Sequence, residues 1–161
     1  MKKIWIILLI CIVVIIISLV VTLLKKRKVE LTSNNIKSIH FSYSTGTMMY
    51  AYARYNIDYK DNKYIASIKP NNIEEEKTKE IEIDKNTLKK IVNVLNKYEV
   101  YCWNNFHKND KNVLDGNSFS FYLKTKDNNE IDASGYMRWP KNYRNVRDEL
   151  DNIFEKLYKN N

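Results

Sequence analysis

The chain has 161 residues, of which 44% are hydrophobic and 29% are charged, and its formal net charge is +8. This length suits one soluble domain once any membrane segment is subtracted. Residues 1–28 hold six of the 27 basic side chains and no acidic one, so the rest of the chain carries 21 basic and 19 acidic side chains. This near balance excludes a basic face for a phosphate backbone, and no nucleic-acid partner is expected.

The first predicted element is a single transmembrane helix over residues 4–24. The stretch from Ile4 to Leu24 carries no charge over 21 residues, and a helix of that length reaches roughly the 30 Å of a bilayer core. An apolar run this long, without a small-residue cleavage site, favours an uncleaved signal-anchor over a cleaved signal peptide. We therefore expect residues 1–28 to be a membrane anchor with basic flanks that contacts the lipid bilayer through residues 4–24.

Two opposed signals bear on the orientation of this anchor. Four basic residues follow the apolar stretch and two lysines precede it, and the positive-inside rule then places the soluble domain in the cytoplasm. A start with two lysines ahead of a long apolar run has instead the form of a signal-anchor that exports the rest of the chain. We favour export and expect a single-pass protein of the cell membrane with an extracytoplasmic domain. The composition, rich in Lys, Asn, Ile and Tyr and poor in Pro, Gly and Cys, is typical of a low-GC Gram-positive bacterium.

A short tether over residues 29–35 is expected to lead into a soluble domain over residues 36–161. Alternating apolar residues and turn signals predict six strands, and two stretches with apolar residues at helical spacing predict two helices. The expected elements, in the order β-β-β-β-α-β-β-α, are 36–45, 47–59, 63–70, 80–83, 84–98, 117–125, 130–137 and 140–158. Residues 99–116 are expected to be irregular. Because strands and helices do not alternate, the predicted fold class is α+β, with the transmembrane helix followed by an antiparallel sheet of about six strands and two helices packed on one face.

The sequence offers little that indicates catalysis or metal binding. Three glycines leave no glycine-rich phosphate loop, and no G-x-S-x-G motif is present. Cys102 and His107 lie five residues apart, but a second local pair of metal ligands is missing. We expect no cofactor, no metal and no enzyme activity, and keep a thiol and imidazole dyad of Cys102 and His107 as the alternative.

Aromatic side chains are the main candidates for binding, because they give a large contact area at a low entropic cost. Tyr50 and Tyr52 lie on a strand face, and the sequence does not decide whether another element covers it. Trp103 lies in the irregular segment, and Tyr136 lies near the end of the last expected strand. Arg138 and Trp139 lie between that strand and the last helix. The candidate binding residues are Tyr136, Arg138, Trp139, Trp103, Tyr50 and Tyr52.

The stretch "SGYMRWPKNY", residues 134–143, is either a ligand site or the corner where a strand becomes a helix. Gly135 permits a bulge or a close backbone approach. Pro140 suits the first turn of a helix, with Asn142 as the competing cap. We predict a corner, in which Arg138 and Trp139 are the two residues that folding alone does not explain.

The segments "LDGNSFSFYLKT", "EIDASGY" and "WPKNY", followed by an amphipathic helix, resemble small uncharacterised membrane-anchored and lipoprotein-like proteins of low-GC Gram-positive bacteria. The resemblance covers residues 114–158 and implies a location and a fold style, without a catalytic residue. The expected function is a membrane-anchored, non-catalytic binding domain for a protein or cell-envelope partner. The alternatives are an envelope enzyme that uses Cys102 and His107, and a membrane-anchored immunity or inhibitor protein.

Overall fold

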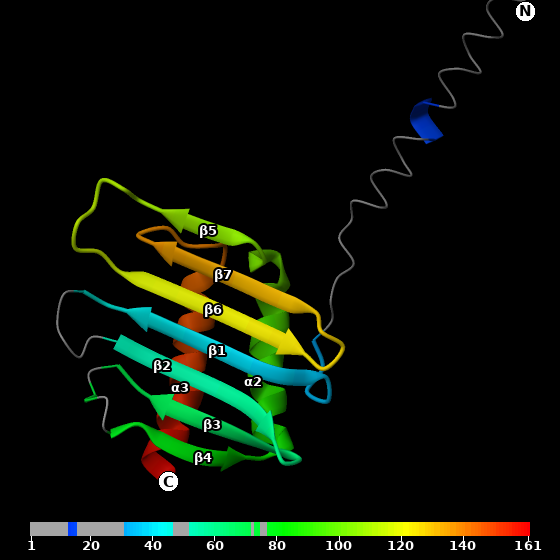
Figure 1. Cartoon of the computed structure of the whole chain (residues 1–161), viewed down its shortest axis with the longest axis vertical. Coiled ribbons are helices and arrows are strands. Elements are labelled where there is room, and N and C mark those ends of the chain that lie inside the picture. The colour runs from blue at the N-terminus through cyan, green and yellow to red at the C-terminus, as the bar shows by residue number, and fades with distance from the viewer. Residues whose placement is uncertain (1–12, 16–30, 47–51, 72, 75–76) are drawn as a thin grey trace, which may run out of the picture.

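The computed structural model describes residues 13–15, 31–46, 52–71, 73–74 and 77–161. Within these ranges the chain forms an α+β fold in which two long helices cover one face of a single mixed sheet (Figure 1). The strands are β1 (Ile36–Ser44), β2 (Tyr52–Lys60), β3 (Lys63–Lys69), β4 (Lys79–Ile83), β5 (Phe106–Asn109), β6 (Ser118–Thr125) and β7 (Glu130–Tyr136). The helices are α2 (Lys85–Lys97), the short 3-10 helix η2 (Val100–Trp103) and α3 (Tyr143–Asn160).

The sheet has the strand order β4-β3-β2-β1-β6-β7-β5. All neighbours pair antiparallel except β5 and β7, which pair parallel. The α+β class is confirmed, but the prediction of about six antiparallel strands is wrong, because β5 forms a seventh strand within the segment expected to be irregular. Backbone hydrogen bonds fix both ends of β5 to β7: Asn105 N–H donates to Asp132 O at 2.9 Å, and Asp110 N–H donates to Tyr136 O at 3.0 Å.

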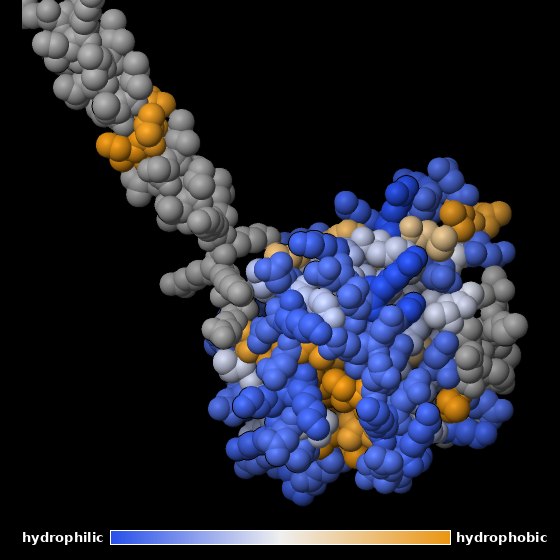
Figure 2. Space-filling view, turned by 180° about the vertical axis from the view of Figure 1, so that it is seen from behind, coloured by the Kyte–Doolittle hydropathy of each residue, from blue (hydrophilic) through white to orange (hydrophobic). Residues whose placement is uncertain are grey.

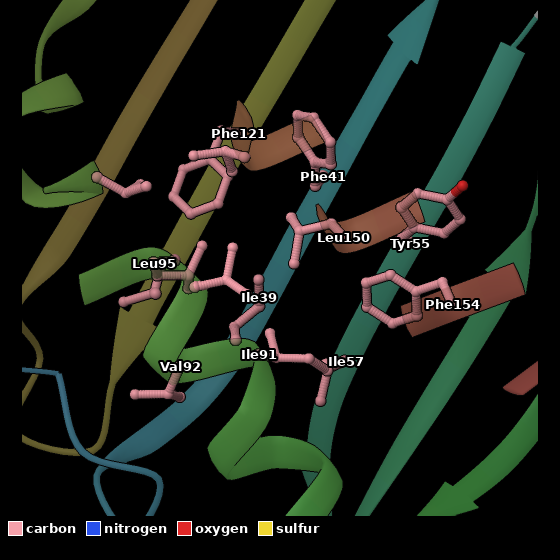
Figure 3. Packing of buried hydrophobic residues seen from close by; sticks show 14 of the residues in the cluster. Ile39, Phe41, Tyr55, Ile57, Ile91, Val92, Leu95, Phe121, Leu150 and Phe154 are labelled. Carbon is pink, nitrogen blue, oxygen red and sulfur yellow. The ribbon is translucent and has the colours of Figure 1, made fainter. Parts of the chain in front are cut away.

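The hydrophobic core lies between the sheet and the two helices. Alternating residues of the central strands point to this side because successive strand residues face opposite sides of a sheet. Figure 3 shows side chains from β1, β2 and β6 directed toward residues of α2 and α3. The labelled members of this cluster are Ile39, Phe41, Tyr55, Ile57, Ile91, Val92, Leu95, Phe121, Leu150 and Phe154. Burial of each such side chain contributes about 1.5–3 kcal/mol.

The starts of the two long helices follow different local rules. Asp84 caps α2 as predicted, since its Oδ1 accepts a hydrogen bond from Thr87 N–H at 2.7 Å. Helix α3 begins at Tyr143 after Asn142, which adopts a left-handed backbone with φ of 64° and makes no side-chain cap. Pro140 therefore precedes the helix, where its carbonyl accepts from Tyr143 N–H at 3.3 Å. The predicted start of α3 near Pro140 is three residues early.

The described part of the chain contains no helix that is both long enough and apolar enough to cross a membrane. The prediction of a transmembrane signal-anchor helix in the fold is corrected accordingly. Residues 13–15 are helical, whereas residues 4–12 and 16–24 of the predicted span lie outside the described residues. The cell-membrane location and the lipid contact through residues 4–24 stay predictions.

Candidate functional site

The two faces of the sheet are covered differently. Helices α2 and α3 pack on one face, and no described helix or strand packs over the other, which faces the viewer in Figure 1. That open face carries mainly half-buried or exposed polar side chains, among them Ser42, Ser120, Ser134 and His107. Its polar character lets the sheet remain in water on that side.

Two hollows flank the short edge strand β5. One, of about 370 Å³, is lined by His107, Asn109, Ser134 and Tyr136 together with their neighbours. The other, of about 580 Å³, is lined by all four β5 residues and by Arg138 and Trp139. We call Phe106–Asn109 with Ser134, Tyr136, Arg138 and Trp139 the β5 surface.

The structure brings three of the six candidate binding residues together on the β5 surface: Tyr136, Arg138 and Trp139. Trp103 is instead a core residue, 1% exposed, whose Nε1–H donates to Lys141 O at 2.9 Å. The 3-10 helix η2 turns its ring into the core, so Trp103 lies apart from the β5 surface.

The other two candidates lie apart from this group. Tyr52 lies on β2, and strands β1 and β6 separate β2 from β7. Its half-buried ring has two cations nearby, with the Arg54 guanidinium carbon 5.3 Å and Lys69 Nζ 5.4 Å from its centroid. Tyr50 lies outside the described residues.

Tyr136 holds the loop that connects β5 to β6. Its hydroxyl donates to Leu114 O at 2.7 Å and accepts from Gly116 N–H at 2.7 Å. At the start of the same loop, Arg138 Nη2 lies 3.0 Å from Asp110 Oδ2. Tyr136 and Arg138 thus fix the loop beside the β5 surface, which gives Arg138, one of the two residues that the sequence could not explain by folding, a structural role.

The backbone between β7 and α3 is tightly constrained. A Cβ on Gly135 would lie 2.1 Å from Arg138 O and 2.5 Å from Phe119 Cε1, so only glycine fits this approach. Met137 then adopts a left-handed backbone with φ of 52°, which is uncommon for a long side chain. The predicted corner is confirmed, and its backbone carries the kind of local strain that gathers at functional sites.

Trp139 joins the core to the surface. Its ring stacks on Tyr143 with a centroid distance of 4.6 Å and an interplanar angle of 20°, and it lies 5.7 Å from the ring of Phe119. The side chain is half-buried and also lines the larger hollow. A ring fixed by the core on one side loses little further entropy when a partner packs on the other.

His107 forms a polar cluster with β7 that the sequence did not predict. Its Nδ1 lies 2.9 Å from Ser134 Oγ, while its Nε2 lies 3.9 Å from Asp132 Oδ2. Asp132 and Ser134 lie on the same face of β7, as their spacing in the sequence indicates. That His107 lies beside them follows only from the pairing of β5 with β7. With the carboxylate beyond hydrogen-bond distance and the imidazole 51% exposed, the cluster supplies donors and acceptors for a polar partner.

Cys102 lies in a different hollow from His107. This hollow, of about 260 Å³, is lined by Cys102, Trp103, Trp139 and Lys141 with their neighbours. Burial, and to a smaller extent a hydrogen bond with Cys102, raises the pKa of the adjacent Tyr101 hydroxyl to about 12. Among the described residues, no three His, Cys, Asp or Glu side chains gather as a metal site.

The helix-covered face carries a further hollow, of about 320 Å³, between α2 and α3. Half-buried Ile153 and Leu157 line it together with Lys90 and Lys156. Figure 2 shows this side of the molecule, where hydrophobic residues appear among a largely hydrophilic surface. The lining includes none of the six candidate binding residues.

Comparison with known protein families, with curated proteins and with solved structures finds no match for this chain. The resemblance of residues 114–158 to small membrane-anchored proteins of Gram-positive bacteria therefore stays a prediction.

Proposed function

We propose that the domain is a non-catalytic binding domain that holds a protein partner on the β5 surface. The observation that carries this proposal is the hollow of about 580 Å³, which is lined by every residue of an edge strand together with Arg138 and Trp139. Tryptophan, tyrosine and arginine are the residue types that contribute most to protein interfaces. The β5 surface has one of each, in Trp139, Tyr136 and Arg138.

The β5 surface is also arranged before any partner arrives. The Tyr136 hydroxyl and the pair of Arg138 with Asp110 hold the adjoining loop, and stacking on Tyr143 holds Trp139. A surface that is already ordered pays less conformational entropy on association. These contacts support a binding role for this corner of the fold.

The alternative functions fit this geometry unequally. An enzyme that uses Cys102 and His107 needs the thiol next to the imidazole, but the ring nitrogens of His107 face Ser134 and Asp132, and Cys102 lines another hollow. An immunity or inhibitor protein acts by binding a protein, so the β5 surface suits it. That assignment and the extracytoplasmic location stay predictions.

Photo-crosslinking in the native host tests the proposal. The photoreactive residue p-benzoylphenylalanine replaces Asn109 on β5 or, as a matched control, Asn93 on α2, since both asparagines are exposed. We expect a discrete protein adduct from position 109 that is missing from position 93. No adduct from position 109, or the same adducts from both positions, would overturn the proposal.

A further inference from the structure

We infer that the partner binds by adding a strand to the outer edge of β5, through an extended segment that carries an acidic residue. This inference rests on the proposed function and names the kind of partner that the β5 surface takes. Strand addition joins an extended peptide to an exposed sheet edge by main-chain hydrogen bonds, while its alternate side chains occupy neighbouring hollows.

The two edges of the sheet differ in how they are covered. At β4, the end of α3 lies against the edge: Lys79 Nζ donates to Tyr158 O at 2.9 Å, and the Tyr158 hydroxyl donates to Lys77 O at 2.7 Å. β5 is the last strand at the other end of the sheet, and the larger hollow is lined by all four of its residues together with Arg138 and Trp139. An edge strand presents unpaired N–H and C=O groups, so β5 offers a partner both backbone groups and space.

The side chains beside β5 indicate what the added segment carries. Phe106 and Lys108 alternate onto the helix side of the strand, next to Trp139, while His107 and Asn109 alternate onto the open face. An apolar residue of the partner would pack on Trp139. An acidic residue next to it would lie within reach of the exposed Lys108, whose side chain extends over the Phe106 ring at 5.3 Å.

A short, charged edge strand is also the usual protection against unwanted pairing. Two features of β5 go beyond protection. The hollow is lined by a half-buried tryptophan, an anchor type of protein interfaces. The loop after β5 runs from the end of the strand toward β6 (Figure 1), and Arg138 and Tyr136 hold it there.

Selection of peptides on the full-length protein tests the inference. The probe is a phage library of random peptides about ten residues long, enough for one strand. We expect selected peptides that combine acidic and large apolar residues, and we expect Lys108→Glu to weaken their binding about tenfold. Lys89→Glu on α2, the same change at another exposed lysine, should leave binding unchanged.

Hydrogen exchange separates strand addition from binding by side chains alone. A selected peptide should slow amide exchange within residues 106–109 and leave residues 79–83 of β4 unchanged. Peptides that bind equally to both charge variants, peptides that leave exchange at 106–109 unchanged, or a failure to select any peptide would each overturn the inference.

The inference and the proposed function fail in different ways. If position 109 gives a protein adduct but the peptide does not slow amide exchange within residues 106–109, the binding function is supported and strand addition is contradicted. If selected peptides add to β5 but position 109 gives no protein adduct in the native host, β5 can accept a strand and the proposed function is contradicted.

Discussion

The side-chain amide of Asn96 bonds to both backbone groups of Leu31. Leu31 N–H donates to Asn96 Oδ1 at 3.2 Å, and Asn96 Nδ2 donates to Leu31 O at 2.8 Å. The Leu31 side chain is buried in the core. Leu31, which lies in the expected tether of residues 29–35, is therefore already part of the domain, and the last turn of α2 fixes its position.

This relationship predicts the effect of Asn96→Ala. The substitution removes both hydrogen bonds and leaves two partly buried backbone groups without these partners, which should lower the free energy of unfolding by about 1–3 kcal/mol. Chemical denaturation of the full-length protein measures this change. Asn93→Ala, at an exposed position of the same helix, is the control, and equal effects of the two substitutions would show that the Leu31 contact contributes nothing.

Asp151 predicts a specific pH dependence of stability. Its carboxylate accepts hydrogen bonds from the hydroxyls of Tyr43 at 2.7 Å and Tyr55 at 2.8 Å. Burial raises the pKa of Asp151 above its ordinary value of 3.8, although the two tyrosine hydrogen bonds lower it. The folded protein thus holds this proton more tightly than the unfolded chain, so the stability contribution is fully present below 3.8 and is lost as the pH rises through the folded pKa.

Denaturation of the wild type and Asp151→Asn across a pH series that brackets 3.8 checks this sign. The wild type should lose stability relative to the variant as the pH rises, and the difference should then become constant. Tyr43→Phe removes one hydrogen bond that lowers the pKa, so it should move this loss to higher pH. A difference that is independent of pH would contradict the account.

Gly135 and Gly116 predict a contrast between two glycines. Gly135→Ala places a Cβ against the Arg138 carbonyl and the Phe119 ring, neither of which can move freely, and should cost about 1–3 kcal/mol or more. Gly116→Ala meets only side-chain atoms, those of the partly exposed Met137 and Tyr136 Cζ at 3.0 Å, and no backbone atom, so it should cost less than Gly135→Ala. Thermal denaturation of both variants measures the order, and the reverse order would contradict the close approach at β7.

We expect Tyr136→Phe to loosen the loop between β5 and β6 locally. Loss of the hydroxyl removes the bonds to Leu114 O and Gly116 N–H while the ring stays in place. The free energy of unfolding should fall by about 1–2 kcal/mol, and amide exchange should rise within residues 112–117. Tyr122→Phe, on the same open face but bonded only to Glu130 among the described partners, is the control and should leave exchange in that loop unchanged.

The sequence predicted the elements whose pattern is long and regular. Helix α2 has a capping aspartate and an apolar stripe at helical spacing, and the central strands alternate over seven or more residues. These patterns follow from burial of one side of each element, which is why the sequence alone predicts them.

The sequence missed β5 because nothing in four residues distinguishes it. Phe106 is its one apolar residue, so the strand shows no alternation of apolar and polar residues. Because β5 pairs parallel with β7, no hairpin turn in the sequence indicates which strand lies next to it. The cluster of His107 with Ser134 depends on that pairing and was therefore also missed. The sequence could not decide between a core and a binding role for Trp103, because a 3-10 turn gives no periodic signal of its buried side.

Modification of the two histidines by diethyl pyrocarbonate tests the central claim most directly. His40 and His107 both lie on the open face with side chains 42% and 51% exposed, and β6 and β7 separate their strands. If a partner covers the β5 surface, His107 should react more slowly in native-host cells than in the purified protein, while His40 keeps its rate. The same ratio of the two rates in cells and in the purified protein would contradict a partner on the β5 surface.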